Sequence, residues 1–69
     1  MSERGDDLRA TAEFLVEDAD RLKAIEEAKL ALPEDDERVL SLSQEAVQVA
    51  ESMVTAARIE LAIAKEPAG

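Results

Sequence analysis

The chain has 69 residues, contains neither Cys nor His, and carries a formal net charge of -9 at pH 7. A chain of this length forms at most one small domain, which usually needs disulfides, metal or association with another chain for stability. Disulfides are excluded by the composition, and the commonest metal ligand is missing, so we expect association. The negative charge argues against direct nucleic-acid binding and against anionic membrane surfaces.

Hydrophobic residues make up 46% of the chain and recur at helical spacing. We therefore expect a folded protein rather than a disordered acidic one. No apolar run approaches the roughly 20 residues that a membrane span needs. The first residues, Met-Ser-Glu-Arg-Gly-Asp-Asp, lack the apolar stretch of a signal peptide. These features predict a cytoplasmic protein that does not bind membranes.

Asp6 or Asp7 is expected to cap the first helix, because a carboxylate favours the positive end of the helix dipole. No helix-breaking residue follows until Pro33, so this helix is predicted from about residue 6 to residue 31. Its apolar residues recur at alternating steps of four and three, which is typical of one helix face packed on a neighbour. The predicted face consists of Leu8, Ala12, Leu15, Ala19 and Leu22.

Pro33 interrupts the helical pattern, because proline has no N–H and disfavours helical geometry at the residue before it. We therefore expect a turn at residues 32–35. Asp35 or Asp36 then caps a second helix, predicted from about residue 36 to residue 65. An apolar seam at heptad spacing runs along this helix, formed by Val39, Leu42, Ala46, Val49, Met53, Ala56 and Ile63.

The connection between the two helices is so short that they are expected to lie antiparallel. The sequence therefore predicts an all-α fold, a two-helix antiparallel hairpin that forms a single domain over residues 1–69. One register pairs Leu22 with Ala46 and Ala19 with Val49. The same register pairs Leu15 with Met53 and Ala12 with Ala56. A large side chain then meets a small one in two of the four layers, which helps to fill the interface between the helices.

The charge is unevenly divided, because residues 1–37 carry a balance of -8 and residues 38–69 a balance of only -1. The second helix also bears a further apolar row that repeats every seven residues outside its seam. A dimer with this helix at its centre, forming a four-helix bundle, explains both features. The residues predicted to associate are Val16, Leu30, Leu40, Val47, Ala50, Val54, Ala57 and Leu61.

A sparser apolar group lies on the opposite flank, where Asp18 and Arg21 interrupt it. We expect this flank to be a patch for a further protein partner. The group consists of Phe14, Ile25, Leu32 and Ile59.

Few residues are suited to catalysis or metal binding. Glu26 and Glu60 fall on the apolar seams, but inward carboxylates that bind metal in helical bundles are joined by His, which this chain lacks. We expect them to pair with bases, Glu26 with Arg38 and Glu60 with Arg4 or Arg9. The Ser and Thr hydroxyls have no His base, and the two glycines form no phosphate loop. The sequence therefore predicts a protein that is not an enzyme and binds no cofactor or metal.

The leading hypothesis is a self-associating helical hairpin that acts as a protein–protein interaction module, such as an adaptor, small subunit or regulator. An alternative is an acidic inhibitor or antitoxin-like protein that masks a basic surface of its partner, because the negative charge is concentrated on the first helix. A third hypothesis, a carboxylate-bridged metal carrier, is disfavoured by the lack of His.

Overall fold

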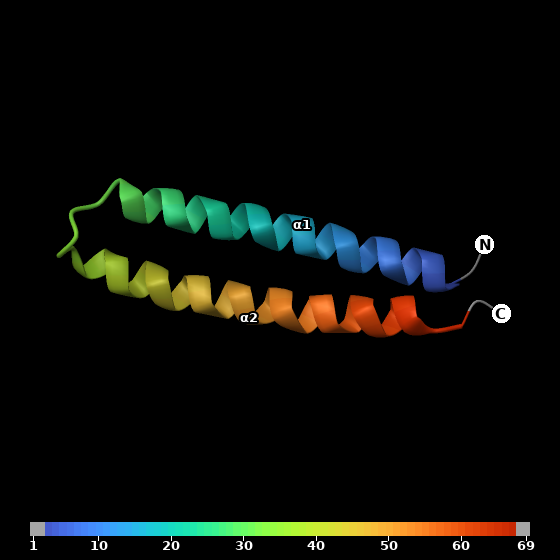
Figure 1. Cartoon of the computed structure of the whole chain (residues 1–69). Coiled ribbons are helices and arrows are strands. Elements are labelled where there is room, and N and C mark those ends of the chain that lie inside the picture. Colours follow the sequence, from blue (N-terminus) through green and yellow to red (C-terminus); the bar gives the residue numbers. More distant parts are fainter. Residues whose placement is uncertain (1–2, 68–69) are drawn as a thin grey trace.

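The computed structural model describes residues 3–67 and consists of two long helices that lie side by side and antiparallel (Figure 1). Helix α1 spans Glu3–Leu30 and helix α2 spans Glu37–Lys65. Together they hold 88% of the described residues, and this part of the chain contains no strand. The prediction of an all-α helical hairpin is therefore confirmed.

Helix α1 begins three residues earlier than the sequence predicted, so a cap at Asp6 or Asp7 was wrong. Arg4 accounts for part of the difference. Its Nε donates to the carbonyl oxygen of Ile63 at 3.1 Å, and its Nη2 donates to that of Ala64 at 3.0 Å. Carbonyls in the last turn of a helix have no partner within it and attract cations. The first turn of α1 is thereby tied to the last turn of α2, as the predicted register requires at this end. The predicted pairing of Ala19 with Val49 was wrong, because Ala19 is exposed and Val49 is buried.

The turn between the helices is closed by backbone hydrogen bonds. The Leu32 N–H donates to the carbonyl of Lys29 at 3.1 Å, and the Asp36 N–H donates to that of Pro33 at 3.1 Å. Asp36 then caps α2, and its Oδ1 accepts from the backbone N–H of Arg38 at 2.9 Å. The sequence left Asp35 and Asp36 open as caps, and the structure selects Asp36.

The Asp36 carboxylate is also held by the Arg38 side chain. Arg38 Nε donates to Oδ1 at 3.0 Å, and Nη2 donates to Oδ2 at 2.8 Å. These side-chain hydrogen bonds, with the backbone one, lower the pKa of Asp36 from 3.8 to about 2. The folded chain thus binds this proton less tightly than the unfolded chain does.

We expect this cap to make the hairpin sensitive to acid. Its contribution to stability is fully present above pH 3.8 and is lost as the pH falls towards about 2. Thermal melting of wild type and Asp36→Ala across this range should show the wild-type advantage shrinking as the pH falls. Asp35→Ala, at the exposed neighbouring acid, is the matched control and should follow wild type. An advantage that is constant with pH would contradict the assignment.

The seam of α2 is the predicted one, since all its members are buried or half-buried. On α1, Leu8, Leu15 and Leu22 face α2 as expected, but the positions between them differ. Ala12 and Ala19 are exposed, so this half of the predicted face was wrong. Helix α1 is rotated from the predicted orientation by about 50°, half of the angle between successive residues. The positions that face α2 instead are Thr11, Asp18 and Ile25. This rotation buries the large side chain of Ile25, which contributes more apolar area than an alanine would.

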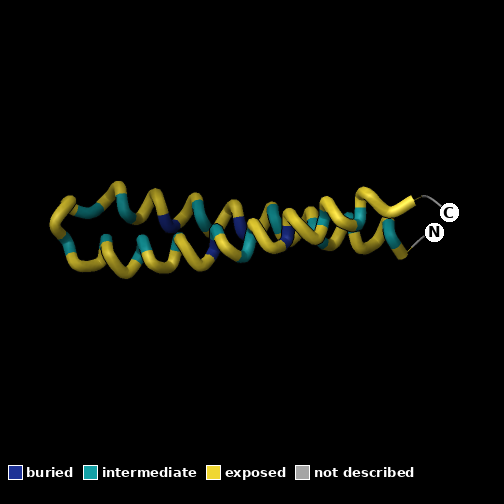
Figure 2. Tube along the Cα trace, turned by 60° about the horizontal axis from the view of Figure 1, so that its bottom comes forward, coloured by how far each residue is buried: buried dark blue, intermediate teal, exposed yellow. Residues whose placement is uncertain are grey.

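The hairpin is a thin rod, whose Cα trace extends over 55 Å along its length and over 16 and 11 Å across it. Figure 2 shows buried positions as isolated spots along the line where the helices meet. Within the described residues the buried apolar side chains are Ile25, Val49 and Ala56, and none has its surface fully covered. A single hairpin therefore holds only a minimal core.

Candidate interaction surfaces

The outer side of α2 carries an exposed apolar row, which we call the α2 row: Leu40, Val47, Val54 and Leu61. These side chains are 51–66% exposed and recur every seven residues, two turns of the helix. A shallow hollow of about 380 Å³ lies over the middle of the row. It is lined by Val47, Ala50 and Val54 and, beside them, by Glu51, Thr55 and Arg58. Soluble proteins rarely leave a large group of apolar side chains uncovered. The four residues of the row were all predicted to associate, and the structure places them together on the surface.

The row is bordered by smaller apolar residues. Ala50 is half-buried and Ala57 is exposed, as suits positions of close helix approach. On α1, Val16 is exposed, and Leu30, at 86%, is the most exposed large apolar side chain among residues 3–67. The exposed Ala12 and Ala19 are three or four residues from Val16, so they share its helix face. The rotation of α1 therefore adds small apolar residues to the predicted association surface.

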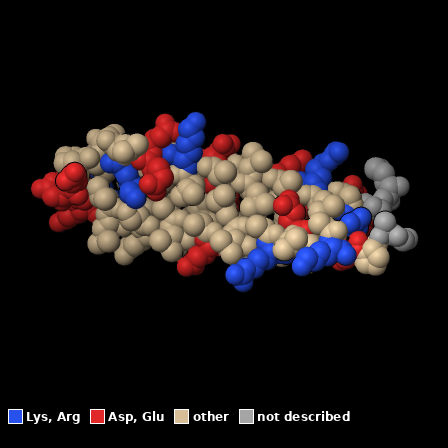
Figure 3. Space-filling view, viewed as in Figure 1, with Lys and Arg blue, Asp and Glu red and all other residues tan. Residues whose placement is uncertain are grey.

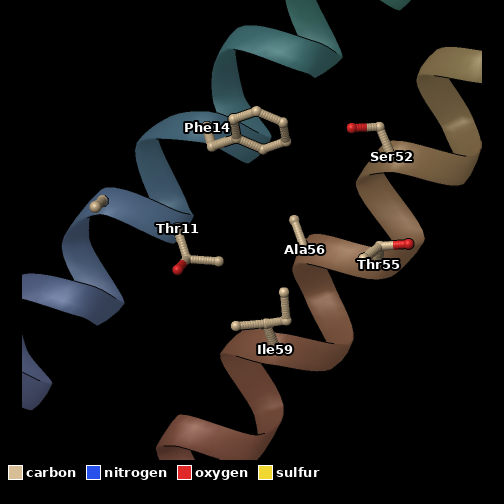
Figure 4. Close-up of a pocket in the computed structure, with 7 residues that line it drawn as sticks. Thr11, Phe14, Ser52, Thr55, Ala56 and Ile59 are labelled. Atoms are coloured by element: carbon tan, nitrogen blue, oxygen red, sulfur yellow. The ribbon is translucent and has the colours of Figure 1, made fainter.

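A second apolar surface is a groove between the helices, with a volume of about 500 Å³. Phe14 and Ile59, both exposed, are its large apolar side chains. Figure 4 shows Phe14 reaching from α1 towards Ser52 on α2, with Ala56 below them in this view. We call this surface the Phe14 groove, and its lining residues are Ala10, Thr11, Phe14, Ser52, Thr55, Ala56 and Ile59.

The predicted partner patch is only partly brought together. Phe14 and Ile59 line the groove, whereas Ile25 is buried between the helices at 8% exposure and Leu32 is half-buried at the turn. Ile25 was predicted on the surface and instead belongs to the core. The reason is again the rotation of α1, which turns Ile25 from the flank towards α2.

Asp18 is the residue whose importance the sequence did not reveal. It faces α2 between Leu15 and Leu22, and its side chain is only 6% exposed. Its Oδ2 accepts no hydrogen bond within the described part of the chain. Its Oδ1 lies 3.9 Å from Nη1 of Arg21, a side chain that is 66% exposed. A buried carboxylate with so little compensation destabilises the fold that contains it.

A second hollow, of about 240 Å³, lies beside Asp18. Glu45 and Gln48 contribute to it from α2, and Arg21 from α1. The hollow is therefore lined by two carboxylates, those of Asp18 and Glu45, and by one guanidinium, so the net charge of its lining is negative. Phe14 and Ser52 border both this hollow and the Phe14 groove, so the two form one continuous surface.

The predicted ion pairs of the seam glutamates were wrong where the structure shows other partners. Glu26 is exposed and pairs with Lys29 at 3.4 Å, while Arg38 is engaged by Asp36. Arg4 donates to backbone carbonyls near the end of α2. Among residues 3–67 no three acidic side chains are grouped as metal ligands.

Charge is distributed unevenly along the rod. Carboxylates gather at the turn, and an uncharged area spans both helices on the face that Figure 3 shows. Neither described helix is long and apolar enough to cross a membrane.

Comparison with known proteins adds no relative. The chain matches no family model, and no curated protein or solved structure shows significant similarity to it.

Proposed function

We propose that this protein is a self-associating helical hairpin that serves as a protein–protein interaction module in the cytoplasm. The observation that carries the proposal is the α2 row, which is exposed along most of the outer side of α2. Two copies that cover each other's rows form a four-helix bundle with a closed core. Such a bundle supplies the burial that a hairpin of this size lacks alone.

The energetic scale supports association. Covering the exposed part of a side chain of this size contributes roughly 1 kcal/mol. Val16 and Leu30 add to the four residues of the row, and every contribution is doubled in a symmetric pair. Their sum is comparable with the usual association cost of about 4–15 kcal/mol. Close approach of the second hairpin is favoured by three exposed alanines, Ala12, Ala19 and Ala57. Close packing there makes the free energy of association more favourable.

We expect the substitution pair Val47→Glu with Val54→Glu to abolish association, because it sets like charges against each other across the two rows. The variant should be monomeric by light scattering at micromolar concentration, and its helicity should be much reduced by circular dichroism. The matched control is Ser41→Glu with Ala62→Glu, which adds two charges at exposed positions of α2 that are not three or four residues from any member of the row. A wild-type mass near the 7.5 kDa of one chain, with full helicity, would contradict self-association and leave the row for another protein.

The second candidate function is an acidic inhibitor that masks a basic surface of its partner. The carboxylates gathered at the turn end support it (Figure 3). Charge-driven binding weakens steeply with salt, whereas contacts through the α2 row respond little. The salt dependence of partner binding therefore distinguishes the two functions.

A further inference from the structure

The surface formed by the Phe14 groove and the hollow beside Asp18 combines three features. It is long, because its lining on α1 extends from Ala10 to Arg21, which is about 17 Å of helix. It is apolar at the Phe14 and Ile59 end. At its other end it holds the buried carboxylate of Asp18, with Glu45 across the hollow.

Asp18 is the part of this surface that indicates a ligand. Its side chain is 6% exposed and therefore 94% buried. Its Oδ2 nevertheless accepts no hydrogen bond from any group within residues 3–67. Arg21, the nearest base, is mostly in solvent and lies beyond hydrogen-bond distance. A carboxylate in this state gains strongly from a donor that arrives with a partner, because hydrogen bonds between charged groups in a dry site are strong.

We propose that this surface binds an amphipathic helix of a protein partner. The apolar side chains of the partner helix pack against Phe14 and Ile59, and a Lys or Arg of the partner helix pairs with Asp18. A helix fits because two packed helices offer a groove into which a third lays its apolar face. A cation fits because the lining of the hollow is net negative. A second copy of the chain suits this surface less well, because the hollow needs a cation and the chain carries 8 bases against 17 acids. The α2 row has no such requirement.

This inference rests on the proposed role as an interaction module, but it does not depend on self-association, which is measured separately. A suitable probe is a fluorescently labelled synthetic helical peptide of about 20 residues. The peptide carries leucines along one face, one lysine in the middle of that face, and glutamine elsewhere. A matched peptide has methionine in place of the lysine, which keeps the length of the side chain and removes its charge. Fluorescence anisotropy gives the affinity of each peptide for the full chain.

We expect Asp18→Asn to weaken binding of the lysine peptide by about tenfold or more, because the charged partner of the lysine is removed. Asp20→Asn changes the net charge equally at an exposed position of α1 and should leave the affinity within about twofold. The methionine peptide should bind wild type and Asp18→Asn alike. A double-mutant cycle built from these affinities isolates the contact between the lysine and Asp18.

The apolar part of the surface is tested by Phe14→Ala, which should weaken both peptides by about tenfold. Ser41→Ala, at an exposed position of α2 that belongs to neither the groove nor the α2 row, should not. Equal weakening by Asp18→Asn and Asp20→Asn would show diffuse attraction to an acidic rod and overturn the inference. The inference would also be overturned if the lysine peptide did not bind wild type. It would be overturned as well if Phe14→Ala lowered the mass measured by light scattering and left the peptide affinity unchanged. A monomeric wild type that binds the lysine peptide through Asp18 would refute self-association and leave this inference standing.

Discussion

Replacing Asp18 with leucine should stabilise the protein. Asp18 occupies a position facing α2 where its neighbours along the helix, Leu15 and Leu22, are apolar, and its Oδ2 is unpaired within the described residues. Replacing buried charges by apolar residues is often stabilising by about 1–4 kcal/mol. For a chain of this size each kcal/mol raises the melting temperature by about 4–8 °C. Thermal melting at one fixed chain concentration measures the change.

Two further variants identify the cause of the stabilisation. Asp18→Asn removes the charge and keeps the shape, so it should recover only part of the gain. Asp20→Leu removes a carboxylate from an exposed position of the same helix, and its effect should stay within about 0.5 kcal/mol. A melting temperature that falls in Asp18→Leu would contradict the view that this carboxylate is uncompensated in the free protein.

The opposite change, Val49→Asp, should unfold the hairpin. Val49 is 5% exposed and lines the same hollow as Asp18 from the other helix. The substitution buries a second carboxylate beside the first, and an uncompensated buried charge costs about 3–5 kcal/mol. A small domain has little more stability than that to lose. Far-UV circular dichroism should show that most of the helicity is gone at neutral pH.

The control for this variant is Gln44→Asp, which adds a carboxylate to α2 at an exposed position and should leave the helicity unchanged. If the two carboxylates repel, Asp18→Leu combined with Val49→Asp should restore more helicity than the two separate effects predict when added. Strict additivity would mean that Asp18 and Val49 do not face each other.

The sequence was sufficient for the helices, the turn and the seam of α2, because each depends on local patterns. Pro33 fixes the end of α1, and an acid after it starts α2. The face of α1 was less well determined. Leu8, Leu15 and Leu22 repeat every seven residues, and a second stripe can lie on either side of them. One choice buries Ala12, Ala19 and Glu26, and the other buries Thr11, Asp18 and Ile25. Each choice buries one carboxylate, so polarity alone does not decide between them.

The sequence also predicted one of the two candidate surfaces better than the other. The α2 row lies outside any seam that a single hairpin can cover, so its exposure follows from spacing alone. The Phe14 groove was recognised only as a sparse apolar flank, because the positions of Ile25 and Asp18 depend on a small rotation of α1. The apolar area that Ile25 buries favours that rotation. Choosing between the two faces of α1 requires the packing of both helices, and the periodicity of the sequence contains no information on that packing.

Because the rod is thin, amide hydrogen exchange should show directly which face of the protein is covered. Because the hairpin consists of two helices in a single layer, each backbone amide of α1 and α2 lies within about one side chain of water. Its hydrogen can exchange with solvent after a small local opening. A neighbour that covers one face adds an opening cost only to the amides beneath it. The pattern of slowed exchange along α1 and α2 is therefore a direct footprint of whatever lies against the molecule, with little background from a deep interior.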